Sequence, residues 1–358
     1  MGHQRWIASA VFAICILAAS SHVLAQRNKK NEEPKTQVLP LPPELPMARA
    51  ADTESLDFHI SPLLLTGGLS AQIRQSLNDL IRDTKGETII KLRAFVAGAG
   101  DARRVQAQAA EIFSDRKLPL PVLSIIQVGA LGRERAQVVI EAVVSTRRIL
   151  NENGLAFFAG QQGASFPAAM ERLKRSLEAA SVTPEHVLTC TCFTSRLENY
   201  EADRAAVQVA FPNTAINLVQ ALRDPANDSS TCEAVGQLSK RPAVPVVWMK
   251  SARATLVNAR QLVFTGLQLT FGSFLDDAHE AFARLERAAS SVNAIEAPVE
   301  VNAFSLDPYS GSALRKSTSV PASTFTIQTV EGLPAMDASA GIEAVLAPNV
   351  QSPITAPE

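Results

Sequence analysis

The tetrapeptide IEAV at residues 140–143 recurs as CEAV at 232–235 and again as IEAV at 342–345. A short apolar stretch that ends in or near a glycine precedes each copy, and the spacing from that glycine to the glutamate is nearly constant. The spacing is 74, 73 and 77 residues from Gly67, Gly160 and Gly266, respectively. Three unrelated segments would rarely agree so well, so the sequence predicts three tandem repeats of one structural unit.

The order of predicted elements is the same in the three repeats. The apolar strand is followed by a stretch with apolar residues three and four positions apart, which predicts a helix. Next come a strand centred on a phenylalanine, a second helix and two closing strands. The first helices are predicted at 73–81, 168–181 and 276–290, and the phenylalanines are Phe95, Phe193 and Phe304. Each repeat is therefore predicted as a β-α-β-α-β-β unit whose helices cover one face of a sheet, while the other repeats cover the opposite face.

The N-terminus has the pattern of a secretory signal peptide. After Arg5 an apolar run extends from Ile7 to Ala19, and short residues precede a cleavage position after Ala25. These thirteen residues are too few for a helix that spans about 30 Å of hydrocarbon. The sequence therefore predicts a signal peptide at residues 1–25 and export to the periplasm or the extracellular space, with an uncleaved membrane anchor as the alternative.

The rest of the chain divides into a linker, three repeats and a tail. Five prolines and mixed charges at residues 26–57 are typical of an extended linker, and residues 348–358 have the composition of a disordered tail. The repeats between them are predicted as domains at residues 58–147, 148–243 and 244–347.

The composition favours a globular protein without a nucleic-acid partner. Of the 358 residues, 46% are hydrophobic and 19% are charged, which is sufficient for sizeable cores. Lys and Arg number 34 against 35 Asp and Glu, so the net charge of −1 creates no general attraction to nucleic acids or anionic membranes. We therefore expect no nucleic-acid partner, and no membrane association once the signal peptide is removed.

Three cysteines remain after the predicted signal peptide. Cys190 and Cys192 are two residues apart in a predicted strand, so their side chains point to the same face. A disulfide from Cys232 to one of them suits an exported protein, and three buried thiols are an equally good interpretation. No second Cys or His pair has the spacing of a zinc site, and the P-loop, dinucleotide-binding and G-x-S-x-G motifs are absent. The sequence predicts no metal and no cofactor.

The repeats resemble the Rid (YjgF-like) family of reactive intermediate deaminases over about residues 58 to 347. The most specific segments are FVAGAGDARRVQAQAAEIF (95–113) and its continuation to IEAVV (118–144), FFAGQ (157–161), HVLTCTCFTSRLENYEADRAAV (186–207), VFTGLQ (263–268), TIQTVEGLP (326–334) and GIEAV (341–345). The resemblance implies an α+β, chorismate-mutase-like fold in which the three copies form a single-chain pseudo-trimer with a central β-barrel-like core. It also implies a monomeric chain with ligand clefts at the seams between copies.

Active members of this family hydrolyse enamines and imines such as 2-aminoacrylate. In them a glutamate on the last strand is thought to orient or activate water, so the resemblance makes Glu141, Glu233 and Glu343 the catalytic candidates. The alternative is that they are structural carboxylates that accept hydrogen bonds from backbone, Lys or Arg groups, because an ionised side chain among apolar neighbours needs a partner.

The resemblance also implies an arginine on the first closing strand, eight residues before the leucine at its end, which would bind the substrate carboxylate. Those positions hold Leu123, Thr214 and Phe325. They are the candidate ligand-binding residues, together with Asn213, and the family arginine is missing. Arg93, on an alternating strand, and Arg223, at the start of a loop, are the substitutes considered, and both are predicted to be solvated.

The function predicted is that of an exported Rid-like scaffold that binds a small molecule or a protein partner in clefts between repeats. Standard deaminase activity is not expected, because the missing arginine removes the usual substrate anchor. The alternative is an enamine or imine deaminase that uses the last-strand glutamates with a non-standard anchor.

Overall fold

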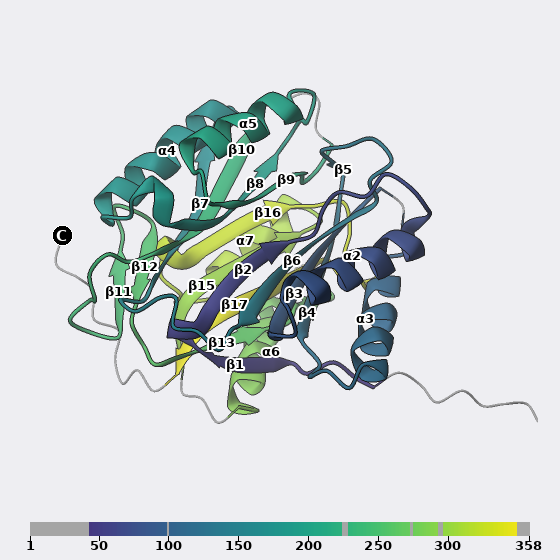
Figure 1. Ribbon diagram of the computed structural model, residues 1–358, viewed down its shortest axis with the longest axis horizontal. Helices are drawn as coiled ribbons and strands as arrows, with labels where there is room; N and C mark the ends of the chain where they lie inside the picture. The colour runs from purple at the N-terminus through teal and green to yellow at the C-terminus, as the bar shows by residue number, and fades with distance from the viewer. Residues whose placement is uncertain (1–42, 99, 224–227, 273–274, 293–295, 349–358) are drawn as a thin grey trace, which may run out of the picture. The chain divides into compact units, whose positions relative to one another are not determined.

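The computed structural model describes residues 43–98, 100–223, 228–272, 275–292 and 296–348 (Figure 1). The predicted signal peptide and residues 349–358 of the predicted tail lie outside the described residues. Part of the predicted linker is structured, since it contains β1 (Ala48–Asp52), the 3₁₀ helix η1 (Thr53–Ser55) and the start of β2 (Leu56–Ile60). Within the described ranges, no helix has the length and apolar character needed to cross a lipid bilayer.

The first repeat forms a four-stranded sheet with helices on one face. Its strands are β2, β6 (Val138–Ser145), β3 (Thr88–Ala97) and β4 (Val122–Val128), in that order. The pairs β2/β6 and β6/β3 are antiparallel, and β3/β4 is parallel. Helices α2 (Leu69–Asp83) and α3 (Arg103–Asp115) bury their apolar sides, including Ile73 and Val105, against this sheet.

The second repeat has the same core in a seven-stranded sheet. The core strands are β7 (Leu155–Gly163), β10 (Ser230–Gln237), β8 (Val187–Thr194) and β9 (Ala215–Gln220), and β11 (Val246–Met249), β12 (Ala254–Val257) and β5 (Ala130–Leu131) extend the edges. Helices α4 (Phe166–Ala179) and α5 (Tyr200–Ala210) cover it, and η2 spans Pro184–His186. Ser165 caps α4, because its side chain accepts a hydrogen bond from the backbone N–H of Ala168.

The third repeat repeats this core in a six-stranded sheet. Its strands are β13 (Gln261–Thr265), β17 (Ala340–Pro348), β15 (Glu296–Ser305) and β16 (Phe325–Thr329), with β1 beside β13 and β14 (Gln268–Thr270) beside β17. Helices α6 (Leu275–Ser290) and α7 (Pro308–Lys316) cover it, and η3 spans Ala322–Thr324. Asp307 caps α7 by accepting hydrogen bonds from the backbone of Tyr309 and Ser310.

Equivalent residues of the three repeats occupy equivalent places in their sheets. Each last strand sets its glutamate opposite one residue of the central strand: Glu141 faces Arg93, Glu233 faces Thr191 and Glu343 faces Asn302. Phe95, Phe193 and Phe304 lie two residues further along their central strands. Their rings meet, with centroid distances of 5.8 Å for Phe95–Phe193 and 6.2 Å for Phe193–Phe304. The periodicity of the sequence is therefore present in the register of the strands.

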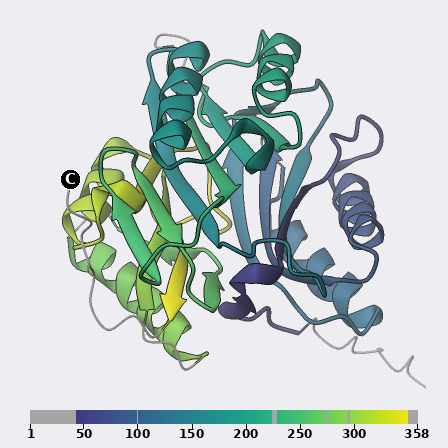
Figure 2. The same ribbon diagram turned by 60° about the vertical axis from the view of Figure 1, so that its left-hand side comes forward.

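The sheets turn their helix-free faces toward one another, and the helices lie outside (Figure 2). One buried cluster joins Ile90 of the first sheet, Phe157 of the second and Phe264 of the third. The expectation of a barrel-like core is correct only in this packing sense, because the described strands form three separate sheets and no closed barrel. Side chains, rather than a continuous ladder of backbone hydrogen bonds, fill the centre.

Short strands link the repeats by pairing across their boundaries. β1, which precedes the first repeat, pairs with β13 of the third, and β12 pairs with β7 of the second although it leads into the third. β5, between β4 and β6 of the first repeat, pairs with β9 of the second. These exchanges cover sheet edges that would otherwise expose unpaired backbone groups.

The structure contains a disulfide between Cys192 and Cys232, which stand directly opposite each other on β8 and β10. Cys190 is a free, buried cysteine. Its Sγ lies 3.9 Å from Sγ of Cys192, which confirms that these two side chains share a face. Burial, with the charges of Glu233 and Glu141, raises the pKa of Cys190 to about 12, so this thiol stays protonated.

Reduction of the disulfide should destabilise the protein. The bond joins residues 40 positions apart, and a loop of this size corresponds to about 3–4 kcal/mol of stabilisation. We expect a reductant to lower the free energy of urea unfolding by this amount in the wild type and in Cys190→Ala, and to have no effect on a Cys192→Ala/Cys232→Ala variant. Equal stability of the wild type with and without reductant would contradict the assigned bond.

Candidate functional site

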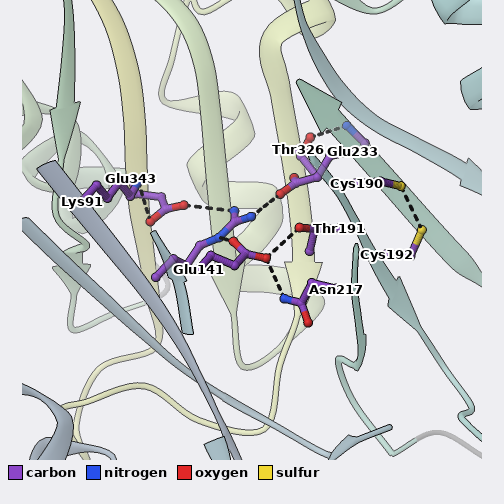
Figure 3. A network of polar contacts seen from close by, with 11 residues as sticks. Lys91, Glu141, Cys190, Thr191, Cys192, Asn217, Glu233, Thr326 and Glu343 are labelled. Atoms are coloured by element: carbon purple, nitrogen blue, oxygen red, sulfur yellow. Dashed lines mark hydrogen bonds and ion pairs between the residues drawn. The ribbon is translucent and has the colours of Figure 1, made fainter. Parts of the chain in front are cut away.

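Three carboxylates, one from each sheet, bind the guanidinium of Arg93. Figure 3 shows Glu141, Glu233 and Glu343 gathered around one point. Nε of Arg93 donates to Oε2 of Glu141 at 2.6 Å, Nη2 donates to Oε1 of Glu233 at 2.6 Å, and Nη1 donates to Oε1 of Glu343 at 3.2 Å. The side chains are 11% exposed for Arg93 and 14%, 6% and 3% exposed for the glutamates, in the same order. The three predicted site residues are thus brought together at one point, not distributed over three clefts.

The prediction of a solvated Arg93 is wrong. Arg93 lies on β3, whose one face is covered by helices and whose other face is covered by the remaining sheets. Successive side chains of such a strand point alternately to the helices and to the other sheets, and neither side is solvent. Arg223, by contrast, has a side chain that is 58% exposed and lies 3.7 Å from Glu331.

Neutral side chains and one lysine contact the remaining carboxylate oxygens. Oε1 of Glu141 accepts from the hydroxyl of Thr191 at 2.7 Å and from the amide of Asn217 at 2.6 Å. Nζ of Lys91 forms an ion pair with Oε2 of Glu343 at 2.9 Å, although this buried oxygen accepts no hydrogen bond within the described part of the chain. With its amide nitrogen turned to Glu233, Asn302 donates to Oε2 at 3.3 Å and accepts from Nη1 of Arg93 at 3.1 Å. The centre is therefore a hydrogen-bonded network in which each repeat supplies donors as well as acceptors.

Burial and charge act in opposite directions on these groups. Burial disfavours the charged form of Arg93, but the three glutamates outweigh it and raise the pKa of Arg93 well above its ordinary value. Burial also acts on Glu343, where the charges of Lys91 and Arg93 prevail and lower its pKa. In Glu233 burial prevails over the charge of Arg93, so its pKa is raised. The network thus holds firmly ionised groups beside one carboxyl that retains a proton more readily.

A cavity of about 70 Å³ lies beside this network and is lined from all three sheets. Four carboxyl groups and two cations line it, namely Glu141, Glu233, Glu300, Glu343, Lys91 and Arg93. Burial and the charge of Glu233 raise the pKa of Glu300 to about 8, which Lys91 and Arg93 only partly oppose. Because most Glu300 side chains are protonated at pH 7, this residue adds little negative charge to the lining. The excess of negative over positive charge around the cavity is therefore smaller.

Leu123 and Phe325 line two other cavities, each between different sheets. In the strand register they correspond to Ile216, because Leu123 pairs with Leu92, Phe325 with Val301 and Ile216 with Cys190. The structure therefore places Ile216, and not Thr214, at the third equivalent position. The segment from this position to the following leucine is two residues shorter in the second repeat, which is why counting back eight residues overshot.

Thr214 and Asn213 stand before β9 and bind the backbone. The hydroxyl of Thr214 donates to the carbonyl of Val187 at 2.7 Å, and the amide of Asn213 donates to the carbonyl of Glu185 at 3.2 Å. Neither lines one of the cavities described above. Both residues fix the connection between α5 and β9.

Sequence reasoning missed the partners of the glutamates, although a signal was available. The residues two positions before the three central phenylalanines are Arg93, Thr191 and Asn302, and those four positions before are Lys91, Thr189 and Glu300. All six are polar, in strands whose other interior residues are apolar. Polar residues at equivalent positions of buried strands indicate a polar centre, since buried polar groups need partners.

Comparison with known proteins does not assign this chain to a family. No protein-family model matches it, and no curated protein is similar to it in sequence. Among solved structures, it is similar to a chorismatase with 12% identity and a TM-score of 0.23, covering 82% of this chain and 99% of the other. A cyanuric acid hydrolase has 12% identity and a TM-score of 0.22, covering 84% and 99%. T. maritima PurL has 10% identity and a TM-score of 0.28, covering 84% and 75%. Scores this low carry no inference about fold or activity.

Loss of Arg93 should destabilise the protein strongly. Arg93→Met leaves three buried carboxylates without their shared cation, and breaking a buried ion pair in this way costs about 3–5 kcal/mol. The matched control is Arg74→Met, because Arg74 is 52% exposed and pairs with the exposed Glu111 at 3.4 Å, where we expect a change of less than about 1 kcal/mol. Urea denaturation at pH 7 measures both, and equal losses would contradict a stabilising role for the network.

The protonation of Glu300 should make stability depend on pH. Its pKa is about 8 in the folded protein against an ordinary value of 4.5, so the folded state binds more protons than the unfolded state between these values. Stability should fall as pH rises from 5 to 8, by up to about 1.4 kcal/mol per pH unit for one proton. Glu300→Gln should flatten this dependence, whereas Glu178→Gln, an exposed residue of α4, should leave it unchanged. Identical pH profiles of the wild type and Glu300→Gln would disprove the assignment.

Proposed function

We propose that this protein is an exported, single-chain pseudo-trimer of the Rid type that binds a small molecule in the cavities between its repeats. The observation that carries the proposal is the place of two predicted ligand-binding residues. Leu123 lines a cavity of about 410 Å³ together with residues of the third repeat, such as Leu267 and Ala335. Phe325 lines a cavity of about 250 Å³ together with Gly160 and Thr231 of the second repeat.

These two cavities have the features of ligand sites at domain boundaries. Each is lined by more than one repeat, so its shape depends on how the sheets pack and is already formed before a ligand arrives. The chemistry of the linings differs: most residues around the cavity at Leu123 are apolar and none of them is charged, whereas Arg253 and Arg315 line the cavity at Phe325. Fusion of the three copies in one chain permits such a difference, which identical subunits cannot have.

The engagement of the glutamates favours binding over deamination. Glu141, Glu233 and Glu343 are hydrogen-bonded to Arg93, and none of them lines the cavity at Leu123 or the cavity at Phe325. A general base must reach the proton that it removes, and the hydrogen bonds to Arg93 hold these carboxylates away from both cavities. The disulfide is compatible with export, because such bonds persist in oxidising compartments.

The proposal predicts binding that a bulky side chain in one cavity removes. Ile327→Trp should fill the cavity at Phe325, and Ala335→Trp should fill the cavity at Leu123. Val209→Trp is the control, since Val209 is 85% exposed on α5. With a panel of small carboxylates, amines and neutral aromatics such as benzoate, benzylamine and phenol, we expect thermal shifts that one filled variant loses and the control keeps.

Two results would contradict this function. Thermal shifts that persist in both filled variants would place the ligand elsewhere. Hydrolysis of 2-aminoacrylate by the wild type above the uncatalysed rate, lost in a folded Glu233→Gln variant, would instead establish the deaminase alternative.

A further inference from the structure

The cavity between the second and third repeats contains two guanidinium groups from different elements. Arg253 precedes β12, Arg315 is on α7, and both line the cavity of about 250 Å³. The remaining lining is polar or small on the side of the second repeat, with Gly160 and Thr231. A cavity with two cations in its wall has the chemical character of an anion site.

Phe325 positions both arginines. Its backbone carbonyl accepts from Nη2 of Arg253 at 3.1 Å, and its ring lies under the guanidinium of Arg315, 5.1 Å from centroid to carbon. Nη1 of Arg315 also donates to the carbonyl of Val320 at 3.0 Å. A guanidinium has five N–H donors, so each arginine keeps donors for a ligand after these contacts are made.

Neither arginine has a carboxylate partner in the described part of the chain. This distinguishes the pair from Arg93, which contacts three carboxylates. Burial, followed by the charge of Arg315, lowers the pKa of Arg253, so the two cations repel each other in the absence of an anion. Arg253 also has a positive φ of 46°, a conformation that costs free energy in a residue other than glycine and is concentrated at functional sites.

We propose that Arg253 and Arg315 together bind a small dianion, either a phosphate monoester or a dicarboxylate, in this cavity. The inference rests on the proposed function and names the ligand class for one of its two cavities. Two guanidinium groups match two negative charges, whereas a monocarboxylate would leave one cation unpaired. Planar guanidinium groups suit both candidates, because each can donate two parallel hydrogen bonds to carboxylate or phosphate oxygens.

Isothermal titration of the full chain with inorganic phosphate, succinate and acetate tests this assignment. We expect phosphate or succinate to bind at least tenfold more tightly than acetate, and the tighter of the two distinguishes phosphate esters from dicarboxylates. Arg315→Gln and Arg253→Gln should each weaken that binding at least tenfold, whereas Arg315→Lys should retain part of it. Arg260→Gln is the control, since Arg260 is an exposed arginine beside another cavity.

Thermal melting without anions identifies the variants that fold, and Arg315→Gln serves if Arg253→Gln does not. Equal dianion binding by the wild type and Arg315→Gln, or a loss confined to Arg260→Gln, would overturn the inference. Absence of dianion binding together with ligand binding in the cavity at Leu123 would overturn this inference and leave the proposed function intact. Absence of binding in both cavities would overturn both.

Discussion

A single guanidinium at the centre of the molecule binds a carboxylate from each of three sheets, and the arrangement of the repeats depends on it. Taking four charges out of water is expensive, and their mutual attraction compensates only when each oxygen and each N–H finds a partner. Arg93 provides three donors in one plane, aimed at Glu141, Glu233 and Glu343. Because the three carboxylates come from separate sheets, only one relative placement of the repeats satisfies them all.

This centre requires a single chain. A homotrimer with the same strand register would place three arginines and three glutamates around one axis, and three guanidinium groups would compete for the same space. Here the positions equivalent to Arg93 hold Thr191 and Asn302, which are smaller, neutral hydrogen-bonding residues. One repeat thus supplies the cation, and the others complete the network with a hydroxyl and an amide. The asymmetry is consistent with copies that diverged after they were joined.

The sequence predicted most elements of the repeats, but not what these elements face. The apolar stretch before Gly67, predicted as the first strand, is not a strand, and β2 takes its place in the sheet. Period and spacing identify Glu141, Glu233 and Glu343 as equivalent residues, and nothing in a one-dimensional pattern says that equivalent residues meet. Arg93 was predicted to be solvated because alternation of polar and apolar residues suggests a strand with one solvent-exposed face, and both faces of β3 are buried. Thr214 was chosen by counting residues, and a connection two residues shorter in the second repeat moves the equivalent position to Ile216. The partner of Cys232 was undecided between two cysteines and is set by strand register.

The central network also fixes the strands that form the cavity at Phe325. Thr231 is two residues before Glu233 on β10, so the carboxylate held by Arg93 determines which residue of this strand reaches the cavity wall. On the opposite wall, Thr326 of β16 is paired in register with Asn302 of β15, and Asn302 binds the same network. The hydroxyl of Thr326 accepts a hydrogen bond from the backbone N–H of Gly160 at 2.6 Å. A one-residue shift in either strand would turn these side chains to the other face. We infer that the buried charges are retained because they specify this register, and that the cavity at Phe325 inherits its geometry from them.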